Sequence, residues 1–136
     1  MAAKNNNKLD KSAADREIRE MFGFVPQFEN AIPEASAYAH WAVQRDLELS
    51  DTVLDHKTKE LIGLAVAAHI KCQYCTYFHT KAAKTFGATD EELREAVAIA
   101  GMTNLYSNSL NGMNVDLQQF RKDTDRAIEA VKNKVM

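Results

Sequence analysis

The fold is decided by residues 56–87, which read HKTKELIGLAVAAHIKCQYCTYFHTKAAKTFG. The central letters LIGLAVAA are apolar on nearly every side of a helix, which is typical of a helix at the centre of a fold. Their Ala and Leu content favours a helix over a strand. We therefore predict a buried helix over residues 56–70, capped by Asp55. A second helix should follow over residues 73–86 and end at Gly87 in the left-handed conformation.

Helical patterns continue toward the N-terminus. Ser12 is the expected cap of a first helix, and Gly23 is its expected end. The next segment, Phe24-Val25-Pro26, should be an extended turn, because the residue before a proline avoids the helical conformation. Another helix is predicted over residues 33–49, since Pro33 suits a first helical turn. The side chains expected to point inward from these two helices are Ile18, Met21, Trp41 and Leu47.

Helical patterns also follow the central stretch. Thr89-Asp90-Glu91-Glu92 has the sequence of a capping box, which begins a helix expected to reach about Asn108. Asn111-Gly112 is typical of a turn. A last amphipathic helix is predicted over residues 115–134. Because no segment alternates as a strand does, we predict an all-α fold.

Length and composition agree with one globular core. The chain has 136 residues, of which 46% are apolar and 26% are charged. We predict a disordered tail over residues 1–11 and a single all-helical domain of about six helices over residues 12–136. The near balance of 17 Lys and Arg against 19 Asp and Glu argues against nucleic acid or an anionic membrane as a partner. The apolar runs are too short for a membrane span and the start lacks a secretory signal, so a cytoplasmic location is expected.

The candidate chemistry lies in the second of the two central helices. Cys72, Cys75 and His79 are separated by three and four residues, so a helix places all three on one face. A thiolate is the reactive form of cysteine, and both a helix start and a neighbouring imidazole favour it. A second thiol three residues away is near enough to form a disulfide. In a reducing compartment this spacing indicates redox chemistry or metal binding.

The attacking cysteine is not fixed by these residues. The helix start favours Cys72, and the imidazole favours Cys75; we prefer Cys75 as the nucleophile, with Cys72 resolving. Glu60 lies twelve residues before Cys72. On one straight helix the two would be about 18 Å apart. A break near residues 69–71 is therefore expected to fold the cysteines back beside Glu60, where a buried carboxylate can relay protons.

The spacing Glu60, Cys72, Cys75, His79 resembles the signature of the alkylhydroperoxidase D-like family, also called the carboxymuconolactone decarboxylase family. Similar surroundings include Lys59-Glu60-Leu61-Ile62 and Gly87-Ala88-Thr89. The resemblance implies an all-helical fold in trimers or hexamers, and peroxidase activity in members with both cysteines.

In the chemistry that the resemblance implies, Cys75 attacks hydrogen peroxide or a small organic hydroperoxide. Cys72 then resolves the sulfenate, while Glu60 and His79 relay protons. A dithiol, thioredoxin-like or lipoyl-type reductant completes the cycle, and no cofactor is needed. Tyr74 stands where the best-characterised peroxidase members carry a histidine, so neither an identical relay nor the same reductant is implied.

Two alternatives remain open at the level of sequence. The first is a protein disulfide reductase that passes electrons to a separate peroxidase. The second is a zinc-binding or non-enzymatic oligomer, because His69, Cys72, Cys75 and His79 read superficially as a Cys₂His₂ set. On one continuous helix the two histidines would be about 15 Å apart, so zinc binding requires a break in the helix.

Overall fold

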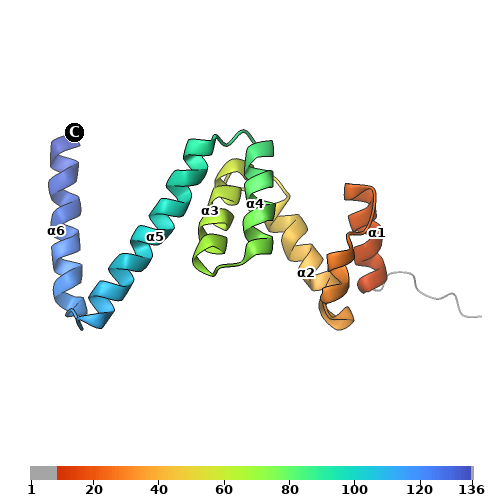
Figure 1. Ribbon diagram of the computed structural model, residues 1–136, viewed down its shortest axis with the longest axis horizontal. Helices are drawn as coiled ribbons and strands as arrows, with labels where there is room; N and C mark the ends of the chain where they lie inside the picture. The colour runs from red at the N-terminus through yellow and green to blue at the C-terminus, as the bar shows by residue number, and fades with distance from the viewer. Residues whose placement is uncertain (1–8, 136) are drawn as a thin grey trace, which may run out of the picture. The chain divides into compact units, whose positions relative to one another are not determined.

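The computed structural model describes residues 9–135, which contain six α-helices and no strand (Figure 1). The all-α fold predicted from the sequence is confirmed. The helices are α1 (Lys11–Phe22), α2 (Ala37–Val43), α3 (His56–His69), α4 (Gln73–Thr85), α5 (Asp90–Gly112) and α6 (Leu117–Val135).

The chain divides into two compact units, Met1–Lys59 and Glu60–Met136, with the boundary inside α3. A single domain over residues 12–136 therefore stays a prediction. Residues 1–8 of the predicted tail lie outside the described residues. The tail was predicted to reach residue 11, but Lys11 already belongs to α1.

Helix α1 begins two residues earlier than expected. Asp10, rather than Ser12, is its cap, and the Asp10 carboxylate accepts the backbone N–H groups of Ser12 and Ala13. Gly23 ends the helix at φ 82°, in the left-handed conformation, as predicted. Ile18 is buried, but Met21 is 48% exposed, so the expectation that Met21 points into the core is wrong.

The helix predicted over residues 33–49 is instead a chain of three short pieces. A 3₁₀ turn, Glu34–Ser36, precedes α2, and a π-helical segment, Gln44–Glu48, follows it. Another 3₁₀ segment, Gln27–Ala31, lies before them. Trp41 is buried as expected, whereas Leu47 is 63% exposed. Six residues separate the two side chains, and in a helix that separation puts them on different faces.

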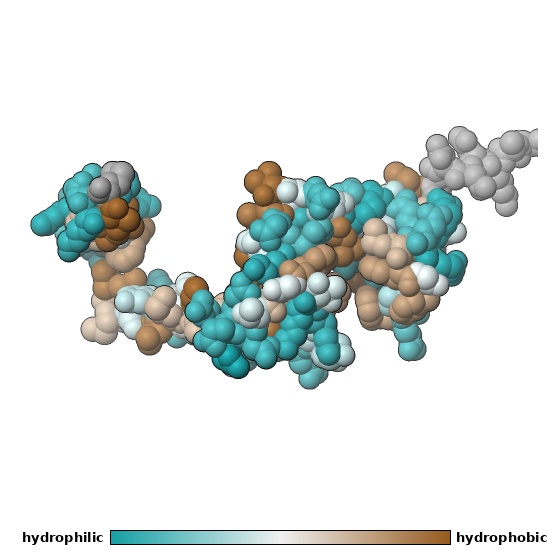
Figure 2. Space-filling model, turned by 90° about the horizontal axis from the view of Figure 1, so that it is seen from above, coloured by the Kyte–Doolittle hydropathy of each residue, from teal (hydrophilic) through white to brown (hydrophobic). Residues whose placement is uncertain are grey.

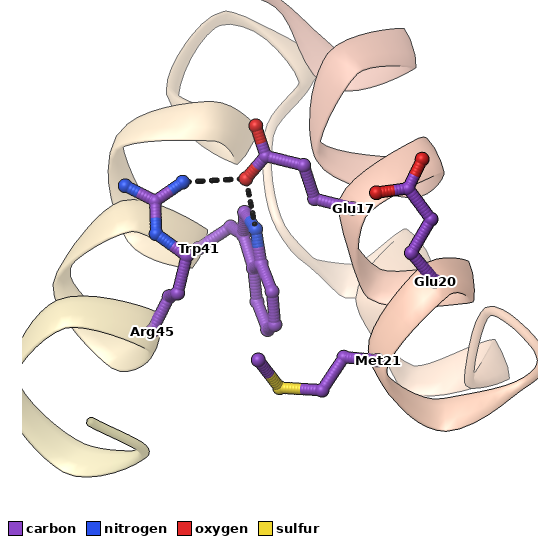
Figure 3. A pocket seen from close by; sticks show the side chains of 5 residues that line it. All are labelled: Glu17, Glu20, Met21, Trp41 and Arg45. Atoms are coloured by element: carbon purple, nitrogen blue, oxygen red, sulfur yellow. Dashed lines mark hydrogen bonds and ion pairs between the residues drawn. The ribbon is translucent and has the colours of Figure 1, made fainter. Parts of the chain in front are cut away.

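A polar cluster ties α1 to α2 in the first unit. The carboxylate of Glu17 accepts a hydrogen bond from Trp41 Nε1 at 2.8 Å and pairs with the guanidinium of Arg45 (Figure 3). It also accepts a hydrogen bond from the Tyr38 hydroxyl at 3.2 Å. Burial acts to raise the pKa of Glu17, but the hydrogen bonds from Trp41, Arg45 and Tyr38 outweigh it and leave that pKa below its ordinary value of 4.5. Beside this cluster, Ala14, Ile18 and Trp41 form the apolar core.

In the second unit, α3 and α4 lie side by side and antiparallel (Figure 1). Leu64 of α3 packs with Ala83 of α4 and with Leu93 of α5. The sequence predicted burial on nearly all sides of α3. Leu64 is indeed buried, but Ile62 and Val66 are about half exposed, because α4 covers only one face.

Local signals place the ends of the remaining helices. Gly87 follows α4 at φ 85°, and the capping box at the start of α5 is formed, with Thr89 and Glu92 each accepting the other's backbone N–H. The turn predicted at Asn111-Gly112 is wrong, because α5 runs through both residues. The chain turns two residues later at Asn114, whose φ of 51° an asparagine tolerates.

Among the described helices, none combines the length and apolarity of a bilayer-spanning segment.

The Glu17 cluster makes the free energy of unfolding depend on pH in the acidic range. Glu17→Gln should reduce the free energy of unfolding at pH 7 by about 1–2 kcal/mol, because the charged acceptor is lost. Since folding lowers the pKa of Glu17, its contribution is complete above pH 4.5 and is lost as the pH falls through the folded pKa. The wild-type advantage over the variant should therefore shrink below about pH 4.5, as measured by urea unfolding.

The matched control is Glu20→Gln. Glu20 belongs to the same helix and lines the same hollow beside Trp41, but it does not take part in this cluster (Figure 3). Its substitution should leave the unfolding free energy within about 0.5 kcal/mol at all pH values. Equal effects of the two substitutions would contradict the assigned role of Glu17.

Candidate redox site

The two cysteines meet at the start of α4. Cys72 and Cys75 form a disulfide, with their Cα atoms 5.4 Å apart. Cys72 is the N-cap residue of α4, in an extended conformation, and its Sγ accepts the backbone N–H of Cys75 at 3.2 Å. The sulfur of Cys72 thus occupies the place that a serine or aspartate oxygen takes in other helices. Both residues are partly exposed, and Tyr74 between them is 80% exposed.

A reversal of the chain before Cys72 brings α4 back along α3. Helix α3 ends at His69, and Lys71 adopts a left-handed φ of 58°. The backbone N–H of Cys72 then donates to the carbonyl of Ala67 at 3.0 Å. The break that the sequence required near residues 69–71 is therefore present.

This reversal pairs Glu60 with His79. The carboxyl of Glu60, on α3, is 1% exposed, and its Oε2 lies 2.7 Å from Nδ1 of His79, on α4. A buried carboxyl without a hydrogen-bond partner would destabilise the fold strongly, so this bond is a structural requirement as well as a chemical feature. Phe78 meets the His79 ring edge-on, with the centroids 5.2 Å apart.

Cys75 and His79, one from each pair, share a face of α4. His79 follows Cys75 by four residues within α4, which is one helical turn, or about 6 Å along the axis. Glu60 contacts His79, and the cysteines contact each other; His79 is the residue of α4 that connects the two pairs. All four residues singled out in the sequence thus come from the α3–α4 hairpin.

Sequence reasoning missed Gly63, which lies against His79. A Cβ atom added to Gly63 would meet the imidazole at 2.5 Å from Nδ1 and 2.7 Å from Nε2. The available signal was a glycine inside an otherwise Ala- and Leu-rich helix, where glycine is less stable than alanine.

The Cys₂His₂ alternative is not assembled in this structure. His69 is exposed at the end of α3. Within residues 9–135, neither cysteine sulfur belongs to a group of three or more ligand atoms gathered closely enough to hold a metal ion. The two sulfurs are bonded to each other, and the imidazole of His79 is hydrogen-bonded to Glu60.

Comparison with known proteins agrees with this hairpin and this fold. The model of the carboxymuconolactone decarboxylase family matches residues 26–116, which is more than half of the chain, so the chain belongs to that family. Its structure is similar to the crystal structure of the alkylhydroperoxidase AhpD core from Rhodospirillum rubrum, with a TM-score of 0.67. The two are 28% identical, over 78% of this chain and 81% of that one.

Two curated bacterial proteins are also similar in sequence. Uncharacterized protein 4 in the cox locus of Paracoccus denitrificans is 43% identical over 51 residues, which are 38% of this chain and 46% of that protein. This chain therefore spans less than half the length of that relative. An uncharacterized protein of Cupriavidus necator is 36% identical over 83 residues, which are 61% of this chain and 69% of that protein.

Removing the imidazole should destabilise the hairpin. His79→Leu leaves the buried Glu60 carboxyl without its donor and should lower the free energy of unfolding by about 2–4 kcal/mol. The double variant Glu60→Leu/His79→Leu should be more stable than His79→Leu alone, because no buried charge is left unpaired. Denaturant unfolding of the oxidised proteins measures both.

His69→Leu is the matched control, since this exposed histidine ends the same hairpin helix. It should change stability by no more than about 0.5 kcal/mol. If the double variant were less stable than His79→Leu, the pairing of Glu60 with His79 would not be what stabilises the hairpin.

Proposed function

We propose that this protein is a thiol-dependent peroxidase that reduces hydrogen peroxide or small organic hydroperoxides through a Cys72–Cys75 disulfide cycle. One observation carries the proposal: a disulfide at the start of α4 lies one helical turn before an imidazole that a buried carboxyl holds. The similarity to an alkylhydroperoxidase core supports the same class of reaction.

In the proposed mechanism Glu60 is ionised, and its bond to His79 sets which nitrogen of the imidazole is basic. A carboxylate only accepts hydrogen bonds, so Nδ1 of His79 carries the proton that is shared with Glu60. The other ring nitrogen, Nε2, is then the proton acceptor. In the proposed mechanism Nε2 takes the proton of the Cys75 thiol, and Glu60 stabilises the imidazolium that results.

The peroxide is reduced by two electrons in the proposed mechanism. The Cys75 thiolate attacks the terminal peroxide oxygen, and the O–O bond breaks. The departing alkoxide or hydroxide takes a proton from His79, which leaves Cys75 as a sulfenic acid. The sulfur of Cys72 attacks that sulfur, the proton lost by the Cys72 thiol goes to the departing hydroxyl so that water leaves, and the disulfide forms. An external dithiol donates two electrons and two protons to restore both thiols.

The N-cap position suits Cys72 for the resolving role. The N–H of Cys75 and the N-terminal end of α4 stabilise negative charge on Cys72 Sγ. Cys72 is therefore the better leaving group when the reductant opens the disulfide, and the mixed disulfide should form on Cys75. The partly exposed cysteines and the exposed Tyr74 suit a protein-bound dithiol, such as a thioredoxin-like or lipoyl-type group, in a reducing, cytoplasmic setting.

The cysteine variants test this assignment. In Cys72→Ser, one equivalent of hydroperoxide should leave a stable sulfenic acid on Cys75, detected by a sulfenic-acid-specific probe and mass spectrometry. Cys75→Ser should form no such adduct. Cys75→Ser should lose steady-state peroxide consumption with dithiothreitol, because the attacking sulfur is absent. Cys72→Ser should keep only the turnover that direct reduction of its sulfenic acid by dithiothreitol supports.

The opposite pattern, with the sulfenic acid on Cys72, would reverse the two roles. If the wild type consumed no peroxide but reduced the disulfide of another protein, it would be a disulfide reductase and the peroxidase proposal would fail. Elemental analysis that found stoichiometric zinc bound to unreactive thiols would also contradict the peroxidase proposal.

We further propose that the protein works as a homo-oligomer in which α5 and α6 lie at the contact between copies. No residue of α6 is buried, and Leu93 is the only buried residue described in α5. Figure 2 shows hydrophobic side chains on the surface of the α6 end of the chain. The large apolar side chains exposed between residues 97 and 135 are Val97, Ile99, Met102, Leu105, Tyr106, Met113, Val115, Leu117, Phe120, Ile128, Val131 and Val135.

These twelve side chains, each at least 41% exposed, offer apolar surface for such a contact. Most helical stability in proteins comes from packing of an apolar face, so we expect α6 to need a partner surface. We expect a second copy of this chain to cover α6, because other copies are present wherever the protein is. The acidic first turn of α5 and the basic last turn of α6 are complementary charges for such a contact.

Phe120→Glu should break this contact. It puts a charge into the apolar face of α6 and should convert the oligomer to a smaller species, as measured by light scattering after gel filtration. Gln118→Glu, on the polar side of the same helix, should leave the mass unchanged. A wild-type protein that is monomeric at micromolar concentration would contradict the proposed assembly.

A further inference from the structure

The imidazole of His79 occupies the space in which almost any residue at position 63 would carry a side chain. A Cβ built on Gly63 would lie 2.5 Å from Nδ1 and 2.7 Å from Nε2 of His79, and closer still to Cε1. Real Cβ atoms essentially never come within 3.0 Å of such neighbours. The ring therefore lies directly against the backbone of α3, in contact that only glycine permits.

The backbone of α3 does not itself require a glycine at this position. Gly63 is in the interior of the helix and is not among the glycines with positive φ, which are Gly23 and Gly87. Glycine in a helix interior is less stable than alanine, so the stability of α3 alone does not explain a glycine at this position. Glycine matters at position 63 because it has no side chain, which leaves room for the imidazole.

Gly63 also stands on the face of α3 that carries Glu60. The two residues are three positions apart, so they are neighbours on one helix face. Glu60 holds Nδ1 at 2.7 Å, while the bare backbone at Gly63 lets the ring approach α3 closely enough for that bond. The carboxyl and the open face together define both the position and the plane of the imidazole.

We propose that Gly63 is a positioning residue for His79: its missing side chain lets the imidazole dock on α3, so that Nδ1 bonds Glu60. The role in turnover rests on the proposed peroxidase function, but the docking of the ring does not. An alanine at position 63 must push the ring away from α3, since the atoms that it meets belong to the ring itself rather than to a flexible chain end.

Gly101 provides a matched control for the substitution. It lies in the interior of α5, and a Cβ at Gly101 would have no atom within 4 Å. Gly101→Ala should therefore raise the midpoint of thermal unfolding, as expected when alanine replaces glycine in a helix. Gly63→Ala should lower it, because the gain in helix propensity is outweighed by displacement of the ring.

The direct readout is the state of the His79 ring. In the wild type, the ¹⁵N NMR signals of His79, assigned by their loss in His79→Ala, should show a proton on Nδ1 that is bonded to Glu60. Gly63→Ala should remove that signature and lower kcat/KM for hydroperoxide by about ten- to a hundredfold, as expected for a base displaced by about 1 Å. Gly101→Ala should leave the His79 signature unchanged, because Gly101 is not in contact with the ring. An unchanged His79 spectrum in Gly63→Ala would overturn the proposal.

A compensating variant keeps the test decisive if Gly63→Ala is poorly folded. His79→Ala removes the ring that the new Cβ would meet, so Gly63→Ala/His79→Ala should be no less stable than His79→Ala alone. A further loss in the double variant would overturn the proposal, since Gly63 would then serve something other than the ring. If the wild type lacked peroxide turnover, the proposed function would fail, while the NMR and stability measurements would still decide the role of Gly63.

Discussion

The hydrogen bond between Glu60 and His79 is the constraint on which the α3–α4 hairpin depends. The carboxyl of Glu60 is almost completely removed from solvent, and its partner comes from a residue nineteen positions later in the chain. Because a buried carboxyl is costly without a partner, α4 must run back along α3 with its His79 face turned inward. Cys75 lies on the same face, and Cys72 caps the same helix and is bonded to Cys75, so one requirement of stability also sets where the two sulfurs lie on the hairpin.

Small residues make this close approach possible. Ala67 on α3 and Ala83 on α4 are almost fully buried, and Gly63 has no side chain at the point where the ring meets the helix. The chain reverses in only a few residues, through the left-handed Lys71 and the bond from the N–H of Cys72 to Ala67. Cys72 thereby becomes the cap of α4. The hairpin thus explains how the two sulfurs reach a helix start without any contribution from a distant segment.

Much of this hairpin could be predicted from the sequence, because its signals are local. Asp55, Gly87 and the Thr89 capping box act within one helical turn, and each is found as predicted. The need for a break before Cys72 followed from helix geometry once Glu60 was taken to act with the cysteines. The contact between Glu60 and His79, by contrast, depends on the packing of two helices, and only the family resemblance suggested that the two residues act together.

The predictions that failed concern which face of a helix is covered. Met21 and Leu47 are apolar but exposed, and a π-helical segment follows α2, which periodicity in the sequence does not reveal. Gly63 was overlooked because glycine in a helix carries no side chain to interpret. Its meaning depends on the neighbouring helix.

The central claim is that the two thiols of this hairpin act together on a peroxide. Its most direct test is a titration of free thiols in the reduced protein before and after one equivalent of hydroperoxide. The account predicts that two thiols per chain disappear together and return on treatment with a dithiol. If both thiols remained unreacted, or if one were lost without the other, the proposed disulfide cycle would be contradicted.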